Sequence, residues 1–170
     1  PYAGLVDPAK VSLPQVREKG GVPAWQRQCR KENGTAQATE DDIRQLMASY
    51  YGMIAYADAQ MQRVWNALEE RGLLENTWVV FGSDHGDYTG EKGLFNKSEA
   101  LYECLLHVPL IVRPPAKIRA PRGMRISHLV NTVDIFPTLL GLADIPVPDY
   151  TQGINLLPWL EAGAEEPIHD

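Results

Sequence analysis

The segment TWVVFGSDHG, residues 77–86, decides the fold of this chain. Its residues 78–81, WVVF, are β-branched or aromatic, and such side chains favour a pleated, buried surface. The uninterrupted run predicts a strand that is covered on both faces. Gly82 and Ser83 end the run. Because ligands in open α/β sheets bind beyond the carboxyl ends of the strands, we expect Asp84 and His85 to lie at a binding site.

The Asp84-His85 pair has two interpretations. A neighbouring carboxylate and imidazole can both reach one divalent cation, because a turn need not send adjacent side chains to opposite sides as a strand does. In the alternative, Asp84 forms a turn and His85 faces solvent. The dipeptide alone favours the second interpretation, and the residues around it favour the first.

The residues that follow carry a longer pattern, SDHGDYTGEKGLFNKSEALYECLLHVPLIVR, at 83–113. It contains a strand ending in Asp-His-Gly, a glycine-rich loop, a lysine, a Tyr-Glu pair and a strand reading His-Val-Pro-Leu-Ile. This order resembles the second signature region of the sulfatase family, within the alkaline-phosphatase-like superfamily. The segments GLLENTWVVF at 72–81 and VDIFPTLLGLADIPVP at 133–148 extend the resemblance to most of residues 40–160.

The resemblance implies an α/β fold, with a mostly parallel sheet flanked by helices and a metal at the strand ends. It implies hydrolysis of a sulfate ester, with Asp84 and His85 as metal ligands and Lys97 in contact with the sulfate group. His107 stands at the family's basic position, where we expect a structural or supporting role. The expected divalent cation is calcium, with manganese and zinc as alternatives because a nitrogen ligand is less typical of calcium.

Part of the family's catalytic apparatus is missing from this sequence. Members use a Cys or Ser, converted to formylglycine, in a Cys/Ser-x-Pro-x-Arg motif, but neither Cys29 nor Cys104 is followed by that Pro and Arg. The family's early paired aspartates are also missing. We therefore expect a partial domain, the later part of a catalytic domain, with no nucleophile, weak metal binding and no turnover of its own. Exposed apolar surface should mark the absent strands.

Two residues depart from the commonest sulfatase pattern. His85 takes a place that many sulfatases fill with Asn, and this His variant also occurs in phosphonate monoester hydrolases of the superfamily. Lys92 stands where a His is frequent. The leading hypothesis is a sulfuric ester hydrolase. The alternatives are a phosphonate or phosphate ester hydrolase built on the same site, and a non-catalytic module that keeps the fold.

Composition narrows the expected partners. The chain has 170 residues, 44% of them hydrophobic, which is ordinary for one globular domain. A net charge of -6 argues against nucleic acid and leaves a small-molecule or glycan sulfate ester as the expected partner. No apolar stretch approaches the roughly 20 residues that span a bilayer, so no membrane partner is expected, and no signal-peptide pattern is seen. The two cysteines indicate no disulfide framework. Compartment and oligomeric state are not indicated.

A long helix is predicted from Thr39 to about Arg71. Thr39 and Asp42 have the spacing of a capping box, and Gly72 is a candidate left-handed cap. Between them, apolar residues recur every three or four positions, which predicts one stripe that packs on the sheet.

Other elements are predicted around this helix and the first strand. Residues 1–38 are expected to be irregular, with the segment QRQCRKENG a solvated loop, and 39–160 to form the core region. A short helix at 98–106, strands at 107–112 and 127–130, and a helix capped by Asp134 and running to about residue 142 follow. The acidic tail at 161–170 is expected to fray.

Overall fold

The computed structural model describes residues 2–14, 21–98, 100–118 and 123–162. It divides into two compact units. The first comprises Pro1–Arg71 and Phe81–Leu110, and the second comprises Gly72–Val80 and Ile111–Asp170. Within the described ranges, no helix combines the length and apolar character that crossing a membrane requires.

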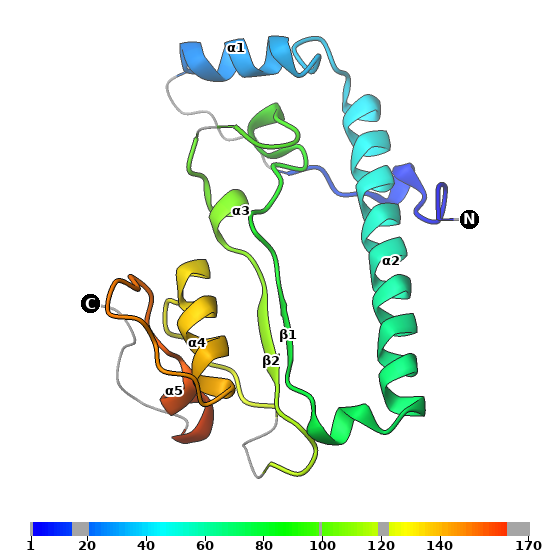
Figure 1. Ribbon diagram of the computed structural model, residues 1–170. Coiled ribbons are helices and arrows are strands. Elements are labelled where there is room, and N and C mark those ends of the chain that lie inside the picture. Colours follow the sequence, from blue (N-terminus) through cyan, green and yellow to red (C-terminus); the bar gives the residue numbers. More distant parts are fainter. Residues whose placement is uncertain (1, 15–20, 99, 119–122, 163–170) are drawn as a thin grey trace. The chain divides into compact units, whose positions relative to one another are not determined.

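The long helix α2, Glu40–Glu70, dominates the first unit (Figure 1). The Asp42 backbone N–H donates to the Thr39 hydroxyl at 3.2 Å, and the Thr39 N–H donates to the Asp42 carboxylate at 2.9 Å. These bonds satisfy two donors that the first turn of a helix leaves without intrahelical partners. The chain leaves the helix at Gly72, whose φ of 64° is left-handed. The predicted helix, capping box and glycine cap are confirmed.

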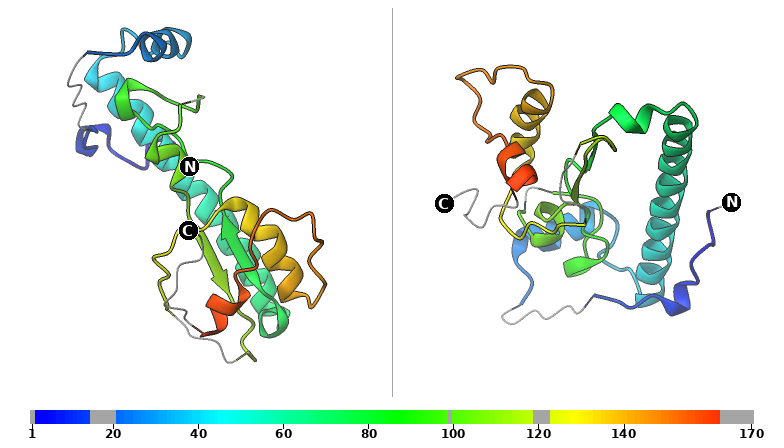
Figure 2. Two further views of the ribbon diagram at one scale, coloured as in Figure 1. Left: turned by 90° about the vertical axis from the view of Figure 1, so that its left-hand side faces the viewer. Right: turned by 90° about the horizontal axis from the view of Figure 1, so that it is seen from below.

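The N-terminal segment lies along α2. It contains the short 3₁₀ helix η1, Pro8–Lys10, and packs Val11 against Met47 and Ala48 of α2. The two elements lie side by side in the views of Figures 1 and 2. A Cβ on Gly52 would lie 2.7 Å from the carbonyl oxygen of Tyr2. The glycine in mid-helix therefore lets this segment approach the helix closely.

The helix α1, Ala24–Glu32, contradicts the prediction that residues 1–38 are irregular. Its segment is also no solvated loop, since Gln26 is only 2% exposed. Its last turn carries Arg30 and Lys31, which suits the negative end of the helix dipole. Gly34 follows with a left-handed φ of 71°.

The strands β1, Val79–Gly82, and β2, Leu110–Arg113, form a two-stranded sheet. They run in opposite directions (Figure 1), so the described strands do not confirm a mostly parallel sheet. Both predicted strands exist, but β1 is only partly buried, so the prediction of cover on both faces is wrong. The prediction of a strand at 127–130 is also wrong, because these residues form no strand. The helix predicted at 98–106 is shorter, and forms α3, Glu103–Leu106.

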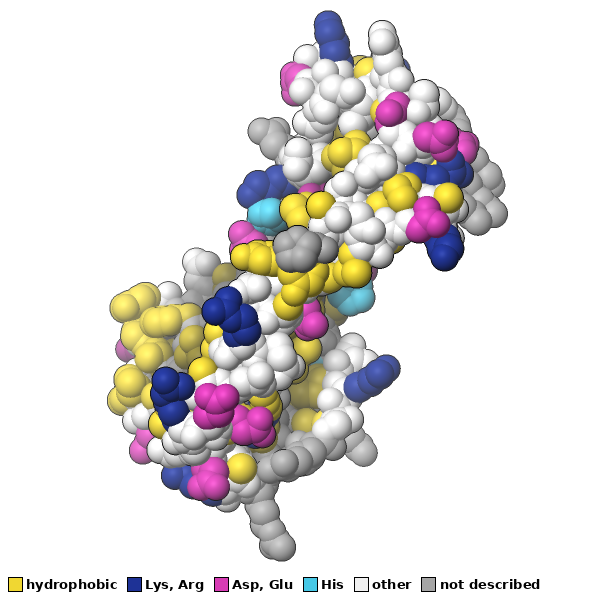
Figure 3. All heavy atoms as spheres, turned by 90° about the vertical axis from the view of Figure 1, so that its right-hand side faces the viewer, with side chains coloured by type: hydrophobic (Ala, Val, Ile, Leu, Met, Phe, Trp, Pro, Cys, Tyr) yellow, Lys and Arg dark blue, Asp and Glu magenta, His cyan; other side chains and the backbone are white. Residues whose placement is uncertain are grey.

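Apolar side chains lie exposed on α2. Met53, Ile54 and Val64 are 61%, 51% and 63% exposed. In Figure 3, hydrophobic side chains are visible across the surface that this view presents. Ile54 and Val64 belong to the predicted apolar stripe, so the prediction that it packs on the sheet is wrong at these two positions. The expected exposed apolar surface is present among the described residues.

The second unit contains the 3₁₀ helices η2, Leu73–Asn76, and η4, Thr132–Asp134, and the helices α4, Ile135–Leu142, and α5, Leu157–Ala162. Asp134 precedes α4 as predicted, but its side chain makes no capping bond to that helix. Its buried carboxylate instead accepts hydrogen bonds from the backbone N–H groups of Asn131 and Ile154 at 2.7 and 2.8 Å. Asp134 therefore joins the start of α4 to the loop that leads to α5. The tail beyond residue 162 lies outside the described residues.

Candidate active site

A tight turn follows β1 and carries Asp84 and His85. The Ser83 hydroxyl donates to the carbonyl of His85 at 2.8 Å, and the His85 N–H donates to the Asp84 carboxylate at 3.0 Å. Next along the chain, the Gly86 N–H donates to the carbonyl of Leu105 in α3 at 2.9 Å. A Cβ on Gly86 would lie 1.9 Å from the carbonyl oxygen of Cys104. The glycine of Asp-His-Gly is therefore needed because the turn packs directly on the backbone of α3.

The hydrogen bonds of the His85 ring define its tautomer. Nδ1 lies 2.8 Å from the carbonyl oxygen of Gly86. A carbonyl only accepts hydrogen bonds, so Nδ1 carries the proton and Nε2 presents a lone pair. Nε2 lies 2.6 Å from Nζ of Lys97 and 3.5 Å from Oδ2 of Asp84. Asp84, His85 and Lys97, which the sequence singled out, thus come together in the first unit.

The Asp84 carboxylate is held in its ionised form. The backbone N–H of His85, from which Asp84 accepts a hydrogen bond, lowers the pKa of Asp84 below its ordinary value. Electrostatic interaction with the His85 ring, and to a smaller extent with the Lys97 ammonium, lowers this pKa further. The side chain is 85% exposed. The turn therefore presents an anionic oxygen beside the lone pair of an imidazole, and both are ligand types for a divalent cation.

His107 is not part of this group. Its ring is 80% exposed, and Nδ1 lies 3.3 Å from the carboxylate of Glu103, one turn earlier in α3. The pairing lies at the C-terminal end of α3, where His107 is the C-cap residue. A supporting role at the active site stays a prediction.

Tyr88 anchors the loop that carries Lys97, and the sequence did not single it out. Its side chain is fully buried against Leu94 and Leu105. The phenol oxygen lies 2.6 Å from the Ser98 hydroxyl and donates to the carbonyl of Ala100 at 3.1 Å. Since Ser98 directly follows Lys97, these bonds fix the backbone next to the lysine. The signal available was a lone tyrosine between two glycines in an otherwise polar loop.

Residues of α1 also hold this loop. The short 3₁₀ helix η3, Glu91–Gly93, contains Lys92 with a left-handed φ of 56°. The carbonyl of Lys92 accepts hydrogen bonds from Gln26 Nε2 and Arg30 Nε, both at 2.8 Å. The Lys92 ammonium lies 6.0 Å from the centre of the Tyr102 ring. The sequence did not single out Gln26 or Arg30, although Arg30 followed by Gly34 is a helix-end signal.

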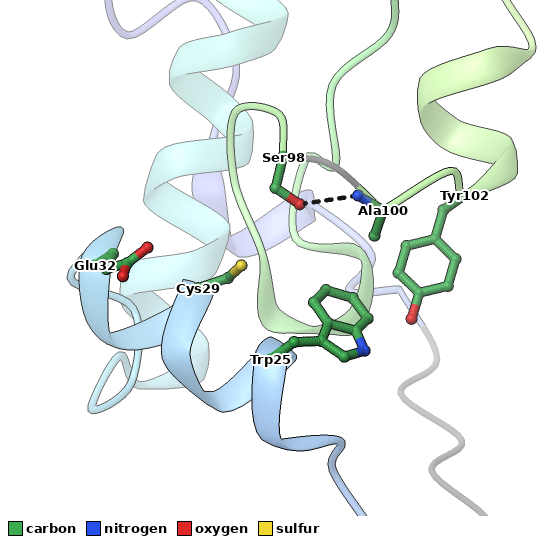
Figure 4. Close-up of a pocket in the computed structure, with 6 residues that line it drawn as sticks. All are labelled: Trp25, Cys29, Glu32, Ser98, Ala100 and Tyr102. Atoms are coloured by element: carbon green, nitrogen blue, oxygen red, sulfur yellow. Dashed lines mark hydrogen bonds between the residues drawn. The ribbon is translucent and has the colours of Figure 1, made fainter.

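A pocket of about 630 Å³ lies where α1 meets the segment after Lys97. The rings of Trp25 and Tyr102 lie next to each other in it (Figure 4), with centroids 5.9 Å apart and planes tilted by 40°. Its volume is in the range of small-molecule sites. The lining residues are Trp25, Cys29, Glu32, Ser98, Ala100 and Tyr102.

Comparison with protein-family models identifies the family of this chain. The model described as Sulfatase matches residues 19–145. The chain belongs to the sulfatase family. This confirms the resemblance seen in the segment from Ser83 to Arg113.

Individual sulfatase relatives agree with the family match. Arylsulfatase K of Xenopus laevis is 39% identical over 137 residues, covering 81% of this chain and 25% of that protein. The chain therefore spans about a quarter of the length of the curated relatives it matches.

Solved structures support the fold. Phosphonate monoester hydrolase SpPMH from Silicibacter pomeroyi matches with a TM-score of 0.79 and 26% identity, over 98% of this chain and 35% of that one. BT1596, a 2-O GAG sulfatase, matches with a TM-score of 0.81 and 28% identity, over 94% of this chain and 36% of that one. These neighbours have the alkaline-phosphatase-like fold, of which the chain forms a part.

Proposed function

We propose that this chain is the later part of the catalytic domain of a sulfuric ester hydrolase. In this proposal, Asp84 and His85 bind a divalent cation and Lys97 contacts the sulfate group. The observation that carries it is the convergence at His85 Nε2, which lies 2.6 Å from the Lys97 ammonium and 3.5 Å from the Asp84 carboxylate. Membership of the sulfatase family supports the same reaction class.

The residues of the turn fit a divalent cation. Metal-bound histidines commonly donate their other ring N–H to a carbonyl, and Nδ1 of His85 has that bond to Gly86. Within the described ranges, no group of three or more His, Cys, Asp or Glu side chains could hold a metal. Since calcium takes about six to eight oxygen ligands, further ligands must come from elsewhere in the whole protein. We propose calcium, with manganese or zinc as alternatives because His85 supplies nitrogen.

In the proposed reaction, the cation and Lys97 have separate roles. A bound cation supplies Lewis-acid polarisation of a sulfate oxygen. Lys97 neutralises charge that develops on the sulfate oxygens in the transition state. Because the Lys97 ammonium donates to Nε2 of His85 in this structure, it must turn from that lone pair to the sulfate when His85 binds a cation. Lys97 is exposed, so nothing buried has to move with it.

The nucleophile must be supplied by another part of the protein. Burial raises the pKa of the Cys104 thiol, and the charge of Glu91 raises it further, so Cys104 stays protonated and weakly nucleophilic. Cys29 lines the pocket beside the loop but lacks the family's nucleophile motif. We propose a formylglycine derived from a Cys or Ser, in a domain whose complete sheet is mostly parallel.

The similar proteins support a class of substrate. Similarity to a 2-O GAG sulfatase and to arylsulfatase K supports a sulfate ester of a small molecule or a glycan. Similarity to a phosphonate monoester hydrolase, together with His85, favours a phosphonate ester as the second candidate. Both groups are tetrahedral anions, so the same cation and lysine can serve either.

The test uses the full-length protein with an aryl sulfate and an aryl phosphonate monoester. We expect the higher kcat/KM for the sulfate, and we expect Lys97→Ala to lower it by about 10²–10³-fold. Lys117→Ala, which removes an exposed lysine of the second unit, is the matched control and should leave kcat/KM unchanged. Preference for the phosphonate would favour the alternative. Turnover of neither ester would favour a non-catalytic module.

A further inference from the structure

We infer that Gln26, Arg30, Asn33 and Thr35, here named the α1 clamp, are positioning residues for Lys97. The inference rests on the proposed function, because it assigns the clamp the task of placing the lysine that contacts the sulfate. None of these side chains is assigned to a cation or substrate. They act through the backbone of the loop that carries Lys97.

The clamp binds backbone carbonyls just before Lys97. Gln26 Nε2 and Arg30 Nε both donate to the carbonyl of Lys92. The Thr35 hydroxyl donates to the Gly93 carbonyl and Asn33 Nδ2 donates to the Phe95 carbonyl, each at 2.9 Å. The clamp thus binds the loop at Lys92, Gly93 and Phe95, in the few residues before Lys97.

Two of the clamp residues are shielded from water. Gln26 and Thr35 are 2% and 9% exposed, so water cannot readily replace their hydrogen bonds. Lys92 has a left-handed backbone, which is strained for a residue with a Cβ, and the clamp binds its carbonyl. A Cβ on Gly93 would lie 2.9 Å from Nε of Arg30, so the glycine leaves room for the guanidinium.

The loop is also held after Lys97. Tyr88 contacts the Ser98 hydroxyl at 2.6 Å, on the far side of the lysine in sequence. The backbone of Lys97 is therefore fixed from both directions, while its side chain reaches His85. A shift of about 1 Å in a group that contacts substrate can cost about 10²-fold in rate. Loss of a clamp hydrogen bond should therefore lower the catalytic rate, although Asp84, His85 and Lys97 are themselves unchanged.

The test compares two glutamines of α1 in the full-length protein. Gln26→Met keeps the side-chain volume and removes the bond to Lys92. Gln28→Met is the control, since Gln28 is exposed and its side chain donates to Glu32, one turn along the same helix, at 2.7 Å. We expect Gln26→Met to lower kcat/KM for an aryl sulfate about ten- to hundredfold, measured well below the melting temperature, and Gln28→Met to leave it unchanged. Thr35→Val, of equal shape, is the second variant and carries the test if Gln26→Met does not fold.

A double-mutant cycle with Lys97→Ala distinguishes a loss of kcat/KM caused by misplacement of Lys97 from a loss caused by general disruption of the fold. If the clamp acts by placing Lys97, Gln26→Met and Thr35→Val should have almost no further effect once the lysine is absent. Equal losses with and without Lys97, or wild-type kcat/KM in the folded single variants, would overturn the inference. If Lys97→Ala alone leaves turnover unchanged, the proposed role of the lysine fails instead.

Discussion

The ammonium of Lys97 lies 2.6 Å from Nε2 of His85, although the two residues are separated by the whole glycine-rich loop. The proton on Nδ1, bonded to the Gly86 carbonyl, leaves Nε2 as the acceptor. Lys97 therefore occupies the same lone pair that a cation would use. Under the proposed function, the lysine and a cation would therefore compete for His85.

This competition predicts opposite effects of one substitution. In the full-length protein, Lys97→Ala should raise the affinity for a divalent cation by a few-fold, because a positive charge and a competing donor are removed. It should also lower turnover. Titration calorimetry with Mn²⁺ measures the affinity, with Lys117→Ala as the control. Weaker cation binding in Lys97→Ala would contradict the competition.

Gly86→Ala tests the packing of the turn on α3. The added Cβ would lie 1.9 Å from the Cys104 carbonyl oxygen, so backbone must shift, and we expect a loss of about 3 kcal/mol in the free energy of unfolding. Gly4→Ala is the control, because no atom lies within 4 Å of its added Cβ and only its left-handed φ of 81° is unfavourable. Urea denaturation of the full-length variants gives both values. Equal losses would show that the contact with Cys104 is unimportant.

Tyr88→Phe tests the anchor of the loop. It removes the hydroxyl that bonds to Ser98 and Ala100 and leaves these half-buried partners beside an apolar ring, which should cost about 1–2 kcal/mol. Tyr150→Phe, at a residue that is 82% exposed, should change stability little. The same denaturation experiment reports both, and a stable Tyr88→Phe variant would contradict the anchoring role.

The parts of the fold that the sequence predicted depend on local patterns. The α2 helix follows from apolar spacing, from the Thr39 cap and from Gly72, all of which act within one or two turns. The Asp84-His85 pair alone favoured a solvent-facing turn, and it was singled out as a candidate site because the longer pattern at 83–113 resembles the sulfatase family.

The parts that the sequence missed depend on distant contacts. Gln26 is a buried polar residue whose amide donates to the carbonyl of Lys92, far along the chain, and no local periodicity predicts such a contact. The segment 127–130 has residues that suit a strand, but a strand also needs a partner with which to pair, and Leu129 is 84% exposed. Asp134 occupies the predicted position, yet its carboxylate binds Ile154 in a later loop.

The capping box of α2 gives a prediction with a definite pH dependence. The hydrogen bonds of Thr39 lower the pKa of Asp42 below its ordinary value of 3.8. A carboxyl group with a lowered pKa in the folded state stabilises that state above its unfolded pKa, and the contribution is lost as pH falls through the folded value. Thr39→Ala should therefore lower the melting temperature by a few degrees at neutral pH and by less at pH values below the lowered pKa. Thr39→Ser should retain the cap. A deficit that stays constant with pH would contradict the role of Asp42.

The most direct test of the account is the metal content of the full-length protein and of its Asp84→Ala variant, measured by inductively coupled plasma mass spectrometry after exhaustive dialysis. Asp58→Ala, at an exposed residue of α2, is the matched control. The account predicts bound divalent metal in the wild type and in Asp58→Ala, and a marked loss of both metal and ester hydrolysis in Asp84→Ala. Unchanged metal content and turnover in Asp84→Ala would contradict the assignment of this turn as the cation site.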